Sequence, residues 1–200
     1  MMKMSYHTPE HHNLDNEENF KRIVAALDSE KRKQQLSAEA IIGYLPELAG
    51  KTVFDGGAGT GFLTLPLAKQ AEKVIAFDQS QKMLELIQER ARNARLTNIT
   101  SMSGDIKAID LPDSSVDIAL VSVMIHEVHP FEEALKELAR IIKPDGQFVI
   151  LEFESETMHA NGGHRIPSYV MKESLEKLQL PIIQQLVPAE GMYLFIVGKK

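Results

Sequence analysis

The sequence predicts an α/β fold built on a mostly parallel sheet. From residue 51 onward, apolar segments of strand length alternate with amphipathic segments of helical length, the order typical of strands joined by crossover helices. Segment 116–123 is almost entirely apolar, as expected of a strand covered on both faces. A glycine-rich turn at 56–61 follows the first of these strands. The 200 residues, 44% of them hydrophobic, are enough for one domain with a sizeable core.

Residues 1–13 are polar and have no apolar period, which indicates a flexible arm rather than a signal peptide. The arm carries His7, His11 and His12. Pro9 would break any helix that placed His7 and His11 on one face, so we expect no metal site there.

A helical extension is predicted before the first strand. Apolar residues recur at positions 20, 23, 24 and 27, which is the spacing of an amphipathic helix beginning near Asn16. Asp28 or Ser29 can cap a second short helix, and Ser37 a third. We therefore divide the chain into an arm and helical extension, 1–50, and a main domain, 51–200. The extension either covers a ligand as a lid or packs on the flank of the sheet.

The main domain is predicted to contain seven strands and four helices. The strands are 52–54, 73–77, 99–102, 116–123, 147–153, 182–187 and 193–197; the helices are 62–71, one capped by Ser80, 130–142 and 168–178. The last two strands flank a turn at 188–191, so we expect an antiparallel hairpin. Segment 154–167 contains Gly162 and Gly163 without an apolar period, and is predicted to be a long loop.

Composition excludes several classes of function. The formal charge of -6 and the pI near 5.7 disfavour nucleic acid as the main partner, because phosphate binding depends on Lys and Arg. With no cysteine, the chain has no disulfide or thiolate nucleophile. The longest apolar run, 118–125, is far shorter than the ~20 residues that span a membrane. We expect a cytoplasmic protein.

The glycine-rich turn reads Asp55-Gly-Gly-Ala-Gly-Thr-Gly61 and is typical of a ligand-binding loop at the carboxyl end of a strand. The third glycine of a dinucleotide fingerprint would fall on Phe62 or Thr64, so the turn does not fit that pattern. A nucleotide-phosphate loop needs a Gly-Lys pair, and no lysine follows before Lys69.

A second carboxylate is expected beside this turn. Asp78 ends the strand 73–77 and follows Asp55 by 23 residues (78 − 55). An acid at this distance past a glycine loop can accept hydrogen bonds from both hydroxyls of a ribose. Ser80 is expected to cap the next helix.

The pattern Asp55-x-Gly57-x-Gly59-x-Gly61 resembles motif I of the class I S-adenosylmethionine (SAM) dependent methyltransferases. Four later segments resemble the family's motifs in the right order, and Leu27-Asp-x-x-x-Arg32 resembles an element of small bacterial quinone-biosynthesis-like (type 11) members. The four segments are 78–84, 103–106, 114–122 and 138–147. Gln147 stands where the family has a glycine.

The resemblance implies a doubly wound, Rossmann-like sheet of seven strands in the order 3-2-1-4-5-7-6, with the last strand antiparallel and helices on both faces. It also implies that SAM is the cofactor. In the family, the residue matching Asp105 meets the adenine amino group, the one matching Ile106 packs on the ring, and a small residue such as Ser122 faces the cofactor. The expected cofactor-binding set is Asp55, Gly57, Gly59, Gly61, Asp78, Gln79, Gly104, Asp105, Ile106 and Ser122.

The segment after 116–123 is where this family places groups that act on the acceptor. It lacks the Asn/Asp-Pro-Pro-aromatic signature of enzymes that methylate planar nitrogens. His126 is the candidate catalytic base or hydrogen-bond partner, because imidazole with its free pKa of ~6.5 works near neutrality. Alternatively it only ties the loop down. His129 is interpreted as local structure.

The loop after 147–153 contains His159, His164 and Arg165. It is either a flap in which Arg165 binds an anion, or a plain surface loop.

The prediction for function is methyl transfer from SAM to a small-molecule acceptor, giving S-adenosylhomocysteine. The alternatives are a non-catalytic SAM-binding module and an RNA or protein methyltransferase. The oligomeric state stays open between monomer and homodimer.

Overall fold

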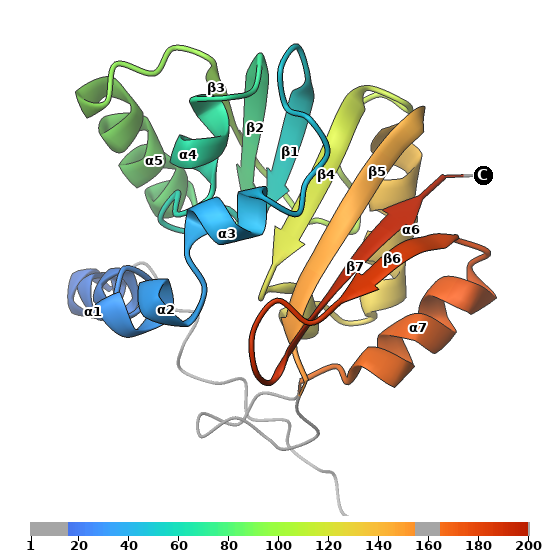
Figure 1. Ribbon diagram of the computed structural model, residues 1–200. Helices are drawn as coiled ribbons and strands as arrows, with labels where there is room; N and C mark the ends of the chain where they lie inside the picture. Colours follow the sequence, from blue (N-terminus) through green and yellow to red (C-terminus); the bar gives the residue numbers. More distant parts are fainter. Residues whose placement is uncertain (1–15, 155–164, 200) are drawn as a thin grey trace, which may run out of the picture.

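A computed structural model describes residues 16–154 and 165–199 of the chain. Seven strands form one sheet in the order β3-β2-β1-β4-β5-β7-β6 (Figure 1), as predicted. The strands are β1 (Thr52–Gly56), β2 (Lys73–Asp78), β3 (Ile99–Ser103), β4 (Val116–Ser122), β5 (Ile142–Phe153), β6 (Ile182–Leu186) and β7 (Met192–Gly198). β7 runs antiparallel to both its neighbours, which confirms the terminal hairpin, and the other pairs are parallel.

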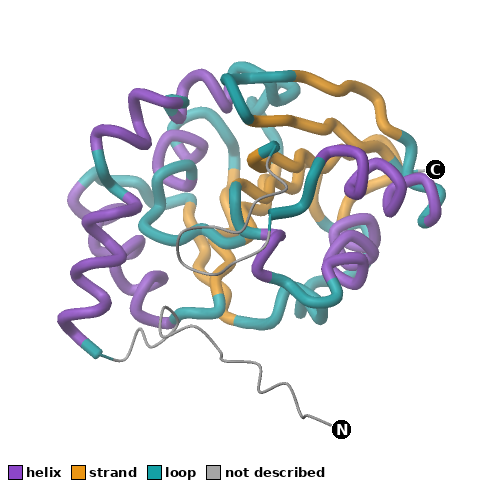
Figure 2. The backbone as a smooth tube through the Cα atoms, turned by 90° about the horizontal axis from the view of Figure 1, so that it is seen from below, coloured by secondary structure: helices purple, strands orange, loops and turns teal. Residues whose placement is uncertain are grey.

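Helices cover both faces of the sheet. They are α1 (Glu17–Leu27), α2 (Glu30–Gln35), α3 (Ala38–Ile42), α4 (Thr64–Ala68), α5 (Gln81–Asn93), α6 (Phe131–Ile141) and α7 (Ser168–Lys177). Apolar side chains of α3 and α4 share a core with one face of β1, β4, β5 and β7, and α5 packs beside them on β2. Those of α6 and α7 share a core with the other face. Figure 2 shows the molecule viewed onto the carboxyl ends of the parallel strands, which lie between the two layers of helices.

The N-terminal helices begin where the sequence predicts. Asn16 caps α1 by accepting a hydrogen bond from the Asn19 amide at 3.0 Å, and Ser37 caps α3 in the same way through Ala40 at 3.1 Å. Ser29 precedes α2 without a side-chain cap bond. Residues 1–15, with the three histidines of the arm, lie outside the described residues.

The helix after the glycine loop is much shorter than the predicted 62–71. It comprises Thr64–Ala68, because residues 60–63 form turns that continue the glycine loop. Its far end is closed by Asn98, whose side-chain amide donates to the carbonyls of Ala68 and Ala71 at 2.8 and 3.0 Å. A side chain that satisfies the last carbonyls ends a helix without further turns.

Two other boundaries differ from the prediction. β5 begins at Ile142 instead of 147, with an irregularity in its pairing to β4 between Val116 and Ile118. Gly146 lies in this stretch, and a Cβ there would be 2.8 Å from the carbonyl oxygen of Asp117, so close approach of two backbones requires glycine. Pro130 caps α6 instead of occupying its first turn.

Candidate active site at the carboxyl ends of the strands

The loop after β1 has a backbone that only glycine adopts readily. Gly57, Gly59 and Gly61 have φ values of 71°, 53° and 83°. The amides of Gly57 and Ala58 donate to the carbonyl of Phe77 on β2 at 2.8 and 2.9 Å, which joins the loop to the neighbouring strand. The loop is therefore a rigid turn whose backbone faces the end of β2.

Asp78 lies at the end of β2 and is hydrogen-bonded to this loop. Its Oδ2 accepts from the Gly59 amide, and its Oδ1 from the Ser80 amide, both at 2.8 Å. Burial raises the pKa of the Asp78 carboxyl, against the lowering effect of these two amides. Each carboxylate oxygen has further lone pairs, so the group can still accept from a ligand. Ser80 also caps α5 through the Met83 amide at 3.3 Å, as predicted.

Asp55 is a second carboxylate at the same edge, and it is only 2% exposed. Its Oδ2 accepts from the Thr64 hydroxyl at 2.6 Å. Burial raises its pKa to about 6; the Thr64 hydrogen bond lowers it, the charge of Asp78 raises it further and Arg32 opposes that increase. Two neighbouring carboxylates without full neutralisation favour a cationic ligand.

The other expected cofactor residues lie around this edge. Ile106 is buried, and its Cδ1 lies 3.1 Å from the position of a Cβ on Gly56, so it borders the glycine loop. Gly104 lies against the Phe77 ring, where a Cβ would be 3.1 Å from two ring carbons. Asp105 is exposed and accepts from the Lys107 amide at 2.9 Å. Gln79 is exposed at the end of β2, and Ser122 ends β4.

The N-terminal helices are attached to the glycine loop through three residues that we call the latch: Asp28, Thr60 and Arg90. Arg90 on α5 contacts Asp28 with both terminal nitrogens, at 2.6 and 3.3 Å, and also donates to the Thr60 carbonyl at 2.8 Å. The Thr60 hydroxyl donates to Asp28 at 2.7 Å. Burial acts against the charge of Asp28, but these hydrogen bonds hold its pKa below the usual value.

Arg32, in the element that resembles part of the family, lies near the latch. Its guanidinium stacks over the Phe62 ring at 5.3 Å and contacts the carbonyl of Leu27 at 3.4 Å. A Cβ on Gly59 would lie 3.6 Å from a methyl of Leu27. Both ends of this element therefore contact the segment that carries the glycine loop.

The segment after β4 approaches the loop from the other side. A Cβ on Gly57 would be 2.6 Å from Cγ of Met124, so this methionine lies against the turn. Val123 has φ 53°, a conformation that is costly for a β-branched residue. Its amide is held by the Leu151 carbonyl at 2.8 Å. The strained backbone at Val123 turns the chain from the end of β4 towards the candidate site.

His126 lies three residues after Val123, in a 3₁₀ turn at Ile125–Glu127. Its side chain is 9% exposed, and its Nδ1 lies 2.8 Å from Oε1 of Glu152, which is fully buried on β5. A carboxylate at Nδ1 favours the tautomer with the proton on that nitrogen, which leaves Nε2 as the basic atom. We call these two residues the His126–Glu152 pair.

Glu152 is also close to a cation. Oε2 lies 3.8 Å from a nitrogen of Arg165, whose guanidinium stacks over the Phe153 ring at 4.0 Å. Burial lowers the pKa of Arg165, and the charges of Glu152 and Glu127 oppose this. Tyr193 closes the cluster by donating to the Ile166 carbonyl at 2.8 Å; burial, with the nearby acidic charges, raises its pKa strongly.

The residues missed by the sequence analysis include Glu152, Arg90 and Met124. For Glu152 a signal existed, because it is the one charged residue of the otherwise apolar run 148–153. Arg90 and Met124 carried no such signal. His129 is exposed, and its carbonyl accepts from Lys107 at 3.1 Å, which agrees with a local role. His159 and His164 lie outside the described residues.

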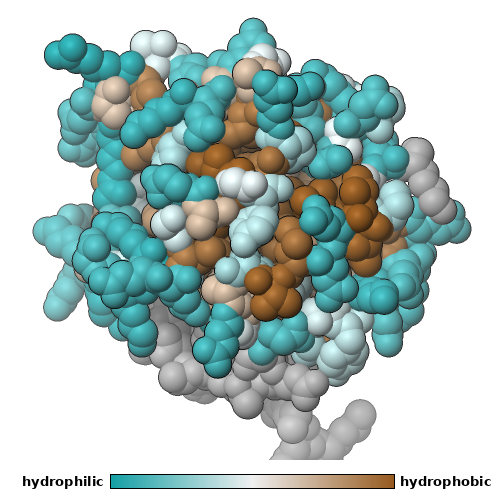
Figure 3. All heavy atoms as spheres, viewed as in Figure 1, coloured by the Kyte–Doolittle hydropathy of each residue, from teal (hydrophilic) through white to brown (hydrophobic). Residues whose placement is uncertain are grey.

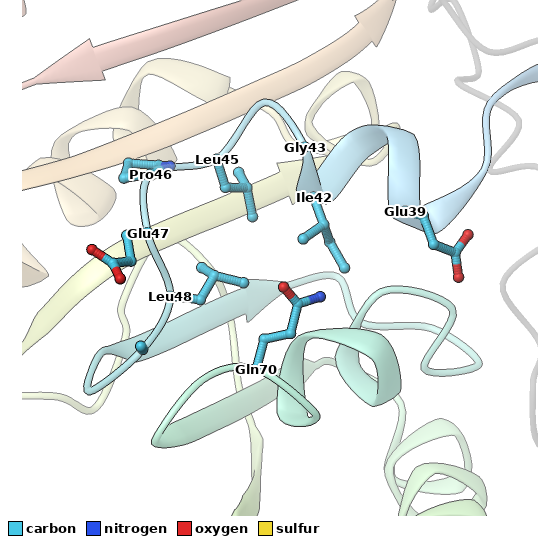
Figure 4. Close-up of a pocket in the computed structure, with 9 residues that line it drawn as sticks. Glu39, Ile42, Gly43, Leu45, Pro46, Glu47, Leu48 and Gln70 are labelled. Atoms are coloured by element: carbon cyan, nitrogen blue, oxygen red, sulfur yellow. The ribbon is translucent and has the colours of Figure 1, made fainter.

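An open pocket of about 610 Å³ lies elsewhere on the molecule (Figure 4). Ala49 and Gln70 border it just before β1 and β2 begin, at the amino ends of the strands. Hydrophobic residues are visible on this face in Figure 3, between hydrophilic ones. The pocket lies away from the carboxyl ends and has no titratable group that is buried, so it is not the candidate site.

Within residues 16–154 and 165–199, no group of three His, Asp or Glu side chains is arranged to hold a metal ion. No helix in the described part of the chain is long and apolar enough to cross a membrane.

The sequence pattern of a family described as methyltransferase domain matches residues 54–150. A curated relative, the demethylmenaquinone methyltransferase of Thermobifida fusca, is 32% identical over 130 residues, which cover 65% of this chain and 53% of that protein. The chain spans about half the length of the first curated relatives it matches.

Solved structures share the fold. A SAM dependent methyltransferase from Aquifex aeolicus superposes with a TM-score of 0.78 at 22% identity, covering 88% of this chain and 96% of that one. The cyclase SpnF superposes with a TM-score of 0.67 at 20% identity, covering 74% and 58%. Likeness at this identity establishes a common architecture, and that architecture serves more than one named activity.

Proposed function

We propose that this chain, which belongs to the class I SAM-dependent methyltransferase family through residues 54–150, transfers a methyl group from SAM to a small-molecule acceptor. The observation that carries the proposal is the His126–Glu152 pair next to a glycine loop that two carboxylates flank. The His126–Glu152 pair can hold a proton, and the glycine loop with its two carboxylates suits a cationic nucleoside.

The cofactor side fits SAM by its donor and acceptor groups. Asp78 is held by the loop amide of Gly59 and retains acceptor capacity for ribose hydroxyls. Asp55 adds negative charge for a ligand that carries a sulfonium and an ammonium group. Ile106 provides an apolar surface beside Gly56 for a flat ring. The backbone of Gly57, Gly59 and Gly61 allows close approach, and Gln79, Gly104, Asp105 and Ser122 complete the proposed cofactor set.

When bound, SAM supplies a methyl group on a positively charged sulfur that is already a good leaving group. The residues of the chain therefore have to align the acceptor, exclude water and, for an acidic acceptor, take up its proton. His126 is proposed to take up that proton at Nε2, while Glu152 holds the ring through Nδ1 and stabilises the imidazolium that forms.

The acceptor class proposed is a small molecule with an acidic O–H or C–H group. A base is useful only where the nucleophile must lose a proton, and the His126–Glu152 pair meets that need. Arg165, stacked on Phe153 beside Glu152, adds a cation near the site for an anionic substituent. The relative from Thermobifida fusca is named for a demethylmenaquinone substrate, which belongs to this chemical class once reduced to its quinol.

The extension 1–50 is proposed as a cover of the cofactor side. The latch joins the end of α1 to Thr60, which lies between two of the loop glycines. α1 presents an amphipathic stripe none of whose residues is buried, so apolar surface remains for contact with a ligand.

The second candidate is a SAM-binding protein that catalyses no methyl transfer. The likeness to a structure named as a cyclase favours keeping it, since the fold alone does not separate the two. An RNA or protein methyltransferase is the weaker alternative, because the formal charge of -6 opposes phosphate binding.

The test is turnover with SAM and a panel of phenols, enols and quinols, measuring S-adenosylhomocysteine. We expect product with at least one acceptor, and formation of that product slowed by ~10²–10⁴-fold in the matched variant His126→Ala. SAM binding by calorimetry without product from any acceptor would support the binding protein. Absence of SAM binding would remove both candidates, and an affinity for RNA that falls steeply with salt would favour the third.

A further inference from the structure

Arg32 brings a positive charge to the cofactor side of the site. It lies on α2, and in Figure 1 α1 and α2 lie beyond the edge of the sheet at which the arrowheads of β1 and β4 end. Its guanidinium stacks over the ring of Phe62, the residue that follows Gly61 of the glycine loop, at 5.3 Å from the ring centroid. This stacking holds the cation beside the loop.

The Arg32 guanidinium has few partners within the protein. It carries five N–H donors, and the one hydrogen bond that its side chain makes among the described residues is to the Leu27 carbonyl, at 3.4 Å. Within residues 16–154 and 165–199, no carboxylate oxygen lies within 4.0 Å of its nitrogens. Burial lowers the pKa of Arg32, and the charges of Asp28 and Asp55 oppose this. A partly dehydrated cation with one long hydrogen bond has donors left for a ligand.

The charges around Arg32 have opposite signs and are not joined in an ion pair. Asp28 is bound by Arg90 through two contacts, at 2.6 and 3.3 Å. Asp55 is close enough that the charge of Arg32 lowers the pKa of Asp55. A ligand complementary to such an arrangement carries a negative and a positive charge next to each other. An α-amino acid does so, because its carboxylate and its ammonium group are attached to one carbon.

We propose that Arg32 binds the carboxylate at the amino-acid end of SAM, with the ammonium group of that end on the side of Asp55. The inference rests on the proposed function and extends it, because the cofactor set named there contains no cation. A carboxylate that leaves water needs donors to replace its hydration. The planar fork of a guanidinium matches the two carboxylate oxygens. Asp78 and Ile106 remain the partners of the ribose and the ring.

This assignment gives the N-terminal extension a direct part in cofactor binding. Asp28 of the latch lies just before α2 and accepts from the Thr60 hydroxyl at 2.7 Å. The latch therefore holds α2 in the place from which Arg32 reaches the cofactor. A ligand without the amino-acid end gains nothing from this side chain.

The test compares two ligands that differ at the amino-acid end. S-adenosylhomocysteine carries the same α-amino acid as SAM, methylthioadenosine has a methyl group in its place, and the sulfur of both is neutral. In the variant Arg32→Gln, calorimetry should show a dissociation constant for S-adenosylhomocysteine raised about tenfold or more, because charge-assisted hydrogen bonds are lost. For methylthioadenosine the same variant should match the wild type within about twofold.

The matched control is Arg22→Gln, which removes an arginine from an exposed position of α1. It should bind both ligands like the wild type. If Arg32→Gln binds S-adenosylhomocysteine as tightly as this control does, the proposal is overturned. A loss by the same factor for both ligands also overturns it, because Arg32 then only supports the loop.

Decarboxylated SAM gives a second readout that needs no variant. It keeps the sulfonium and ammonium groups and lacks the carboxylate, so it should bind to the wild type about tenfold or more weakly than SAM. Equal affinity for the two would overturn the proposal. A wild type that binds neither SAM nor S-adenosylhomocysteine would overturn the proposed function and this inference with it, whereas tight binding that Arg32→Gln leaves unchanged would overturn only the role of Arg32.

Discussion

The two sides of the strand-end site are built differently. The cofactor side depends on backbone groups: loop amides bond to Phe77, and the Gly59 amide bonds to Asp78. The acceptor side depends on a side-chain pair 26 residues apart in sequence, His126 in the turn after β4 and Glu152 on the neighbouring strand β5. Backbone geometry imposes a residue pattern on the sequence, whereas a side-chain pair can change with little effect on the fold. The comparison teaches why the cofactor side can be recognised from a pattern of residues in the sequence, whereas the acceptor side cannot.

The largest effect is expected on the acceptor side. His126→Ala should lower turnover by ~10²–10⁴-fold and leave SAM affinity nearly unchanged, because proton removal matters in the transition state and hardly in cofactor binding. Steady-state kinetics and calorimetry measure the two quantities.

Glu152→Gln is the companion variant. It should keep SAM affinity and lose part of the turnover, because the amide no longer stabilises the imidazolium. A His126→Ala protein with full turnover at saturating acceptor would exclude the ring from the chemistry. Loss of SAM affinity together with thermal stability would instead assign His126 to holding the loop.

On the cofactor side, Asp55→Asn should have opposite effects on SAM binding and on the stability of the fold. The pKa of Asp55 is about 6 in the folded chain against an ordinary value of 3.8, so the folded state binds this proton more tightly than the unfolded state. Its contribution to stability is therefore greatest at low pH and falls as pH rises from about 4 through about 6. This difference in pKa corresponds to about 3 kcal/mol.

Relative to the wild type, the asparagine variant should gain free energy of unfolding over that interval, while its SAM affinity falls at neutral pH. Urea unfolding between pH 4.5 and 8 checks the first statement, and calorimetry the second. A stability difference that does not vary with pH would show that Asp55 is not the titrating group.

Asp78→Ala should weaken SAM binding by ~1.5–3 kcal/mol, the range for losing hydrogen bonds to a charged acceptor. Calorimetry should show this with an intact fold by circular dichroism. Part of the loss reflects the freed amide of Gly59, so the loop should also exchange its amide hydrogens faster. An unchanged dissociation constant would remove Asp78 from the site.

The smallest effect is expected at the latch. Arg90→Gln should weaken SAM binding by about 0.5–1.5 kcal/mol, because the N-terminal helices are then held less firmly on the loop that Thr60 belongs to. Arg92→Gln, at an exposed position of the same helix, is the control and should match the wild type.

Hydrogen exchange of α1 supplies the second measurement. SAM should slow exchange in α1 of the wild type and do so less in Arg90→Gln. Equal protection of α1 by SAM in both proteins would mean that the N-terminal extension does not belong to the cofactor side. The difference between the cofactor side and the acceptor side would then be sharper.

Several features were predictable from sequence because their cause is local. The glycines at 57, 59 and 61 follow from positive φ angles, and the Ser80 cap from an unpaired amide at a helix start. The apolar run of β4 follows from its burial on both faces. Even here local reasoning failed at α4, where the contact of Asn98 with Ala68 and Ala71, from a different part of the chain, ends the helix early.

The sequence by itself determined the α/β class, the glycine loop, Asp55, Asp78 and the place of His126 after β4, because each depends on backbone conformation or burial near that residue. Only the tertiary structure decided that Glu152 faces His126, that Arg90 reaches Asp28, and that Met124 lies on Gly57. The physical reason is that a side-chain contact between segments depends on strand order, register and rotamer together, and no short stretch of sequence contains all three.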